Sequence, residues 1–385
     1  MKKTTCIASL MVCLSMGQAG ALAQNIRIDM NKTYPEKTIS LQKVADVKYI
    51  PLETTDEALF NGVVTHLSAE GIAGFNKKEG DILVFDGTGK AIASFNHTGQ
   101  GPNEYNKIYH LDVDWKQKEV YVQDNFRQKI RIYALDGSHL RTIDLQETMQ
   151  EGDLYNFSDT HLIYYAKPKS KPVTAYQPVT LLSKKDASKA TLPFTKTDDN
   201  LVKATGGPFG DMKMSAKNVN LLCKKGYEVY VNEVTADVIY RVESNHALTP
   251  VVERTPSYQD ASGQDFFLML TGANARYYFF KRQQSLLEFQ GNAASDTKST
   301  YVAYDRKEKQ LLNPTFTNED YPSQDISMSK LLQCAGSANR CYLQLEAFKL
   351  KEALAEGKLK GTLKSIAEKL DEEDNPVLMV VEFKK

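Results

Sequence analysis

The sequence lacks a net charge. Its 48 lysine and arginine residues balance its 48 aspartate and glutamate residues. Proteins that bind nucleic acid or anionic membranes through surface charge carry a basic excess, so we expect no nucleic-acid partner. The sequence also lacks an apolar run of about 18 residues or more, the length that a membrane-spanning helix requires. We therefore expect no membrane span.

Cysteine is scarce, and its spacing predicts no metal site. Two of the five cysteines lie in the first 23 residues. Cys334 and Cys341 flank a short polar loop and are the candidate disulfide, because an oxidising compartment permits one. Cys223 follows two leucines and is expected to be a small buried side chain. The six histidines form no metal-binding motif, so we expect neither a metal nor a cofactor.

Local motifs for catalysis are also missing. The sequence has no Gly-x-Ser-x-Gly motif, and the glycine-rich segment Gly99–Tyr105 lacks the Lys-Ser/Thr ending of a phosphate-binding loop. Acidic residues are plentiful, but nothing in the sequence brings two of them together. Asp124, at the end of a predicted strand, is expected to accept hydrogen bonds from the turn that follows. We therefore assign no catalytic residue.

The N-terminus has the order of a secretory signal peptide. Two lysines precede an apolar stretch from Cys6 to Met16, and small residues stand at positions 21 and 23. We predict a signal peptide over residues 1–23, cleavage before Gln24 and a secreted or periplasmic protein. Lipoprotein anchoring at Cys13 is the less favoured alternative, because Val12 stands where a small residue is needed.

Short alternating strands recur along the rest of the chain. Glu119–Val122 and Glu228–Val231 share the sequence Glu-Val-Tyr-Val. The segment that begins at Val84 matches the one that begins at Ile132, roughly 48 residues later, with Gly89 and Gly137 at the same offset. Antiparallel units of about 40 to 50 residues are typical of propeller blades. We therefore predict one all-β domain over residues 24–385, a six-bladed β-propeller.

Several segments resemble a known family. Gly99–Tyr105, Leu111–Asp114, Glu119–Asn125 and Lys129–Tyr133 together resemble one NHL-type repeat. The whole chain, with Ile50–Glu53 near its start and Asp374–Met379 near its end, is similar to secreted six-bladed propeller proteins of gut Bacteroidetes. The resemblance implies the fold and export. It implies little about activity, because one fold supports many functions.

The blades are expected near residues 58–96, 105–146, 152–195, 215–254 and 264–303, and the last one combines Val302–Phe316 with both chain ends. The apolar strand Val377–Phe383 should close the ring by pairing with the strand Val47–Ile50. Residues 343–371 have the spacing of one or two amphipathic helices inserted in the last blade. These helices are expected either to pack as a lid on one face of the ring or to bind a partner.

Candidate ligand-binding residues are polar or aromatic side chains in or near loops that could converge on the ring's mouth. The densest aromatic cluster, Phe266–Arg282, is expected to be mainly core, although an arginine beside tyrosines suits sugar or carboxylate recognition. The candidates are His97, Gln100, Asn103, Glu104, Tyr105, His110, Arg127, Arg276 and Tyr278.

We favour a non-enzymatic binding module for a glycan, peptide or protein at the mouth of the central channel. The alternative is a hydrolase or lyase that acts on an extracellular polysaccharide or peptide. That alternative requires carboxylates or a histidine close together at the mouth, with shifted pKa values. A structural or assembly role is the remaining option.

Overall fold

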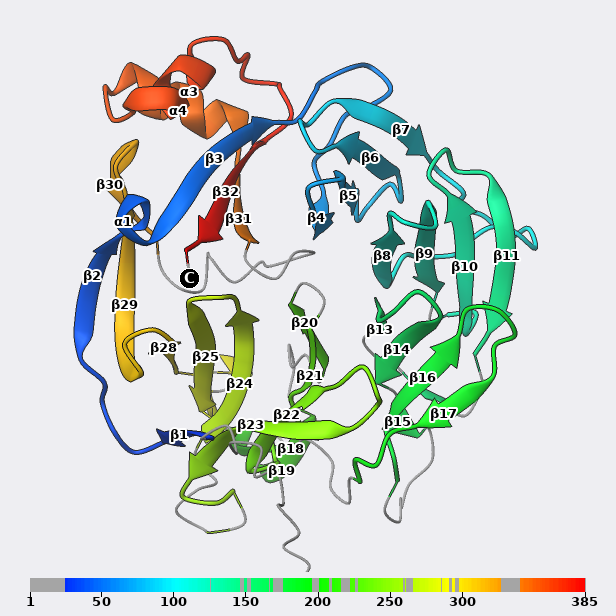
Figure 1. Ribbon diagram of the computed structural model, residues 1–385, viewed down its shortest axis with the longest axis vertical. Helices are drawn as coiled ribbons and strands as arrows, with labels where there is room; N and C mark the ends of the chain where they lie inside the picture. The colour runs from blue at the N-terminus through cyan, green and yellow to red at the C-terminus, as the bar shows by residue number, and fades with distance from the viewer. Residues whose placement is uncertain are drawn as a thin grey trace, which may run out of the picture.

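The architecture comes from a computed structural model of the chain. It describes residues 25–124, 126–145, 149–150, 154–165, 167–168, 176–195, 201–207, 210–215, 222–225, 228–258, 260, 266–284, 286–290, 293–294, 298–326 and 340–384. These residues form a six-bladed β-propeller, with the blades arranged around a central axis (Figure 1). The predicted fold class is confirmed.

Blades 1 and 2 are four-stranded antiparallel sheets in which each strand pairs with the next along the chain. Gly89 and Gly137 occupy the outer hairpin turns with φ of 92° and 89°, as the repeated glycine predicts. Blade 1 contains β4 (Val63–Leu67), β5 (Gly71–Phe75), β6 (Ile82–Asp86) and β7 (Ala91–Phe95). Blade 2 contains β8 (His110–Asp114), β9 (Glu119–Asp124), β10 (Lys129–Ala134) and β11 (His139–Asp144).

Blades 3 and 4 repeat this order. Blade 3 contains β13 (Leu154–Asn156), β14 (His161–Tyr165), β16 (Val179–Ser183) and β17 (Lys189–Thr191). Blade 4 contains β20 (Leu222–Lys225), β21 (Glu228–Val231), β22 (Val238–Val242) and β23 (Leu248–Thr255). The short strands β12 (Met149–Gln150) and β15 (Lys167–Pro168) pair beside them.

Blade 5 extends further along the chain than the sequence predicts. It contains β24 (Phe266–Ala273), β25 (Tyr277–Gln284), β28 (Ser299–Asp305) and β29 (Gln310–Asn318), and β30 (Tyr321–Ile326) pairs with the end of β29. Val302–Phe316 therefore belongs to blade 5, not to the last blade. Between β25 and β28 the chain leaves the blade: β26 (Leu286–Gln290) and β27 (Ala293–Ala294) form a separate sheet with β18 (Leu201–Gly207) and β19 (Gly210–Ser215). The alternating pattern marks these strands but not the sheet that each one joins.

Blade 6 joins the two ends of the chain. β32 (Val377–Phe383) lies between β31 (Arg340–Leu345) and β3 (Ala45–Pro51), with Val47 opposite Val381. The predicted closure by the C-terminal strand is confirmed. β32 is almost entirely buried, because it is the central strand of this three-stranded sheet.

The N-terminal segment also wraps around the outside of the ring (Figure 1). β1 (Ile26–Asp29) pairs in parallel with the outer strand of blade 4, and β2 (Glu36–Ser40) pairs in parallel with that of blade 5. The short helix α1 (Leu41–Val44) then leads into β3. These strands cover two sheet edges, which would otherwise expose unpaired backbone groups.

The predicted helical insertion is confirmed, with different limits. α3 (Ala347–Ala355) and α4 (Gly361–Ala367) lie between β31 and β32, whereas Leu343 belongs to β31. Leu350 and Leu363 are buried in the same core as Phe316 of blade 5. Figure 1 shows the helices at the rim of the ring, beside β3 and β30.

The aromatic segment of β25 divides between two cores. Tyr277 and Phe279 pack on the side of blade 6, and Tyr278 and Phe280 pack on the side of blade 4. Alternate side chains of a strand point to opposite faces, so one strand contributes to both interfaces. The expectation that this segment is mainly core is confirmed.

Candidate functional site

The predicted binding loop Gly99–Tyr105 is held by Arg127. The Arg127 guanidinium donates to the carbonyl oxygens of Gly99 (3.0 Å), Gly101 (2.9 Å) and Glu104 (3.2 Å). It also donates to the side-chain oxygen of Gln100 at 2.8 Å. The Glu104 carboxylate in turn accepts from the Gly101 amide at 2.6 Å. The loop therefore uses most of its polar groups to fix its own shape.

The aromatic candidates around this loop are also engaged. Tyr105 is fully buried, donates to the Gly80 carbonyl at 2.7 Å and accepts from the His97 amide at 3.0 Å. The His97 ring stacks on Tyr133 with centroids 5.0 Å apart, and Tyr133 donates to the Asn103 carbonyl at 2.6 Å. Burial raises the pKa of Tyr105 to about 12, so its hydroxyl stays protonated.

Arg276 and Tyr278 do not form a shared site. Arg276 pairs with Asp305 at 2.8 Å, and its guanidinium lies over the Tyr277 ring at 5.6 Å. The Tyr278 ring is buried, and the guanidinium over it is that of Arg306, at 4.8 Å. Each tyrosine therefore has a different arginine over its ring, and the two candidates contribute to no common binding surface.

Among the sequence-selected candidates, His110 lies close to a buried cluster of charged residues around Asp112. It begins β8, the innermost strand of blade 2, and its ring meets Tyr155 of blade 3 edge-on at 4.9 Å. Burial lowers the pKa of His110 to about 4, nearby Asp112 opposes this shift, and Lys224 adds to it. His110 is therefore neutral at pH 7.

Asp112, two residues further along β8, joins four blades. Its Oδ1 lies 3.1 Å from His66 Nδ1 on β4 and accepts from the Val113 amide. Its Oδ2 accepts from Lys224 Nζ of blade 4 at 2.6 Å and from the Asn156 amide of blade 3 at 2.7 Å. We call these four residues, His66, Asp112, Asn156 and Lys224, the ring-centre cluster. β4, β8, β13 and β20 are the innermost strands of their blades and surround the axis in Figure 1.

The charged side chains of the ring-centre cluster are buried. The side chains of His66, Asp112 and Lys224 are 8%, 5% and 9% exposed. Burial alone would raise the pKa of Asp112, but the Lys224 ammonium and the hydrogen bond from His66 outweigh it and bring the pKa below its ordinary value. Asp112 is therefore an ionised carboxylate, compensated by the ammonium of Lys224.

Three buried polar atoms around this cluster have no hydrogen-bond partner within the described part of the chain. They are His66 Nε2, Asn156 Oδ1 and Trp115 Nε1. Trp115 follows β8, and its ring lies 6.2 Å from that of His66. Gly71 helps to fix the indole, because a Cβ on Gly71 would come within 2.2 Å of it. Buried polar groups are normally paired, so these three atoms are candidates for contact with a ligand or with water.

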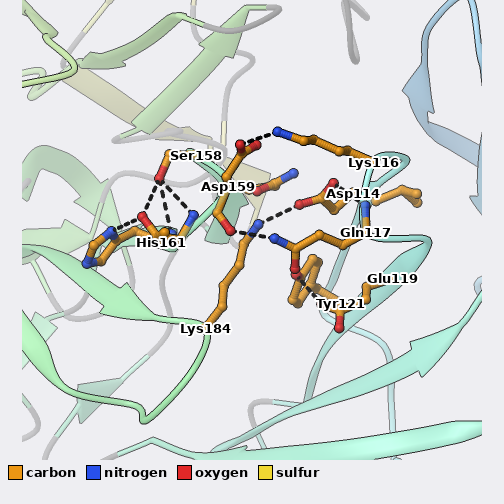
Figure 2. Close-up of polar contacts among 12 residues, drawn as sticks. Asp114, Lys116, Gln117, Glu119, Tyr121, Ser158, Asp159, His161 and Lys184 are labelled. Carbon is orange, nitrogen blue, oxygen red and sulfur yellow. Dashed lines mark hydrogen bonds and ion pairs between the residues drawn. The ribbon is translucent and has the colours of Figure 1, made fainter.

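A second polar network, around Asp114, differs from the ring-centre cluster because its charged groups form complete pairs. Figure 2 shows Asp114, at the end of β8, facing Lys184 of blade 3, with Nζ to Oδ2 at 2.6 Å. The Lys184 ammonium also lies 5.3 Å from the Tyr121 ring centre, and the Tyr121 hydroxyl donates to Glu119 at 2.6 Å. Lys116 pairs with Asp159 across the same seam. This network joins blades 2 and 3 through complete pairs, so we assign it a structural role.

Asp124 behaves as the sequence predicts. Its carboxylate accepts from the amides of Asn106 at 2.8 Å and Arg127 at 3.3 Å, and it pairs with the fully buried Arg131 at 3.2 Å. Its structural role is therefore confirmed.

The remaining cavity and cysteines provide no further candidate site. A cavity of about 300 Å³ lies between β30, β31 and the start of α3. Cys341 is buried on β31, and Cys334, the other half of the candidate disulfide, lies outside the described residues. Among the residues that the structure describes, no three His, Cys, Asp or Glu side chains are placed to hold a metal ion. In the same part of the chain, no helix has the length and apolarity to cross a membrane.

Sequence reasoning missed His66, Asp112, Asn156 and Lys224. One local signal was available: His110, Asp112 and Asp114 alternate with Leu111 and Val113, which puts three polar side chains on one side of a buried strand. The partners of Asp112 come from strands as far as 112 residues away in sequence, and no local pattern predicts that meeting.

Comparison with known proteins agrees with this fold. Residues 25–382 match the family described as a domain of unknown function, DUF4934. The chain belongs to the DUF4934 family. No curated protein sequence matches the chain.

The fold of this DUF4934 protein is similar to that of a Bacteroides fragilis protein whose name describes it as exported. The two share 15% identity with a TM-score of 0.60, over 93% of this chain and 100% of the other. A DUF4221 family member from Bacteroides vulgatus matches with 8% identity and a TM-score of 0.48, over 89% of this chain and 98% of its own. The first likeness supports the six-bladed ring and nothing finer.

Proposed function

We propose that this DUF4934 protein is an exported binding module that receives a polar group of a glycan, peptide or protein at the ring centre. One observation carries the proposal: His66 and Asn156, which bind the Asp112 carboxylate, and Trp115, whose ring lies beside that of His66, each have a buried polar atom without a partner in the described residues. Residues that converge on a rigid scaffold from several elements are typical of binding sites. The proposal moves the site from the predicted loop, Gly99–Tyr105, to the cluster around Asp112.

Export rests on the predicted signal peptide, which lies outside the described residues. Mass spectrometry of protein from the periplasmic or secreted fraction should find Gln24 at the N-terminus. An intact leader, or a lipid on Cys13, would contradict this part of the proposal.

The binding test is a screen of the purified protein against glycan and peptide arrays, followed by titration calorimetry on any hit. Asn156→Leu removes the Oδ1 acceptor and keeps the backbone amide that binds Asp112. We expect it to weaken binding at least tenfold. Gln100→Ala, on the loop, is the matched control and should bind as the wild type does. An absence of saturable binding in both arrays would refute the binding role.

The enzymatic alternative is favoured by the contact between His66 and Asp112. An imidazole held by a carboxylate, with its other nitrogen unpartnered, has the arrangement of a general base. Incubation with polysaccharides and peptides, followed by mass spectrometry of the products, tests this alternative. Turnover that is lost in His66→Gln would replace the binding proposal with an enzymatic one.

A further inference from the structure

Whether each of the three unpartnered atoms donates or accepts a hydrogen bond restricts the class of ligand that can bind. The first step is the tautomer of His66. Its Nδ1 faces the Asp112 carboxylate at 3.1 Å, so Nδ1 carries the proton in that contact. In the tautomer that carries its single proton on Nδ1, Nε2 has a lone pair and accepts a hydrogen bond. A ligand must therefore donate to His66.

The second step concerns the charge that a ligand meets. Both oxygens of Asp112 already accept two hydrogen bonds each, and Lys224 compensates its charge. The carboxylate charge is already balanced by the Lys224 ammonium, which repels a second cation. The site therefore offers little to a charged amine.

The third step adds the other two atoms. Asn156 Oδ1 is an acceptor, and Trp115 Nε1 is a donor only. Beside the Lys224 ammonium, these atoms are two acceptors and one donor. The two acceptors disfavour a ligand carboxylate or phosphate, which would place acceptors against acceptors. A hydroxyl group both donates and accepts, so it complements this set.

The fourth step favours several hydroxyls over one. His66 and Asn156 bind different oxygens of Asp112 and come from different blades, so their acceptors need donors at separate positions. A single hydroxyl has one proton to donate. A sugar ring carries hydroxyls on different carbons, and its apolar face suits the half-buried indole of Trp115.

We infer that the ring centre binds a neutral sugar residue of a glycan, whose hydroxyls donate to His66 Nε2 and Asn156 Oδ1 and accept from Trp115 Nε1. This inference rests on the proposed binding function and specifies its ligand class.

Trp115 makes the inference directly testable. It is the only tryptophan of the chain, so intrinsic fluorescence reports on this position alone. The purified protein is titrated with neutral oligosaccharides of glucose, galactose and mannose, with oligogalacturonate, and with peptides rich in Asn and Gln. We expect a saturable change in emission with a neutral oligosaccharide and none with oligogalacturonate or the peptides.

Variants then connect the binding to the named atoms. Trp115→Phe keeps an aromatic ring without the N–H, and His66→Phe removes the acceptor while Asp112 keeps Lys224 as its partner. By calorimetry, each should weaken neutral-glycan binding at least tenfold, whereas Gln100→Ala should leave it unchanged. Circular dichroism verifies folding, and Trp115→Phe is the decisive variant if His66→Phe fails to fold.

The outcomes separate the inference from the proposed function. If a glycan binds without a change in Trp115 emission and with wild-type affinity in both variants, the ligand site is elsewhere and the inference is wrong, although the binding function stands. Binding of peptides or oligogalacturonate alone also overturns the inference. If none of the probes and no array ligand binds, the proposed function fails as well.

Discussion

The loop Gly99–Tyr105 and the ring-centre cluster are both polar, but they use their polar groups differently. In the loop, one guanidinium binds three carbonyls and a side-chain amide that lie within a few residues of each other. At the ring centre, Asp112 gathers groups from three other blades, and three neighbouring polar atoms have no partner in the described residues. Polar residues close together in sequence can satisfy one another locally. At the ring centre, unlike in the Asp114–Lys184 network, groups brought together by the fold leave polar atoms available to a ligand.

The largest expected loss of stability comes from removing the Asp112 carboxylate. Asp112→Ala leaves the Lys224 ammonium and the His66 ring buried without their shared partner. Breaking a buried ion pair on one side costs about 3 to 5 kcal/mol, so the free energy of unfolding should fall by that amount. Urea denaturation measures it.

The matched loop variant is Glu104→Ala, which removes one carboxylate that accepts from the Gly101 amide. Its expected cost is about 1 kcal/mol. Equal losses of unfolding free energy in Asp112→Ala and Glu104→Ala would mean that the Asp112 carboxylate stabilises the fold no more than a loop carboxylate does.

The next effect concerns pH and His110. Its pKa is about 4 in the folded protein against an ordinary value of 6.5. As pH falls from about 6.5 to 4, the unfolded chain takes up a proton that the folded chain does not, so stability is lost over this range. Each unit between the two pKa values corresponds to about 1.4 kcal/mol, which allows a loss of up to about 3 kcal/mol.

His110→Gln is the variant that isolates this titration. The difference in unfolding free energy between wild type and variant, measured at several pH values, should change between pH 6.5 and 4 and stay level above that range. Asp112 does not obscure the result, because its lowered pKa places its own loss at more acidic pH. A difference that is flat throughout would show that His110 is not buried from solvent.

The fold could be predicted from the sequence because its signals are local. The repeated glycines at positions 89 and 137 identify equivalent turns in successive blades, and the apolar run of β32 identifies a buried closing strand. The fifth blade was assigned wrongly at its end because strand alternation says nothing about pairing. β25 and β28 pair over seven residues although another sheet's strands intervene in sequence.

The site could be predicted only in part for a related reason. His110 is a candidate because it follows the loop Gly99–Tyr105, and it does lie near the Asp112 carboxylate. His66, Asn156 and Lys224 gave no signal, because each is an ordinary polar residue on a short strand. Their importance arises only when blades 1, 3 and 4 meet at Asp112.

A smaller effect is expected from Arg127→Ala on the loop side. The variant loses four hydrogen bonds, but the carbonyls it releases are only partly buried and can bind water. We expect a loss of about 1 to 3 kcal/mol in unfolding free energy and unchanged ligand affinity. Calorimetry with any ligand identified by the arrays checks the second expectation. Weaker binding in a folded Arg127→Ala would place the loop within the binding surface.

The smallest effect is expected from Gln100→Ala. The Gln100 side chain is exposed and makes one hydrogen bond, at 2.8 Å, to a guanidinium that keeps three backbone acceptors without it. Surface substitutions of this kind usually change stability by less than about 0.5 kcal/mol. Thermal and urea unfolding should therefore match the wild type, and ligand affinity should be equal within error. This variant is the sharpest test of the comparison, because Gln100 is an exposed polar side chain of the loop and a candidate for ligand contact. A tenfold loss of affinity at unchanged stability would mean that the loop, and not the cluster around Asp112, contacts the ligand.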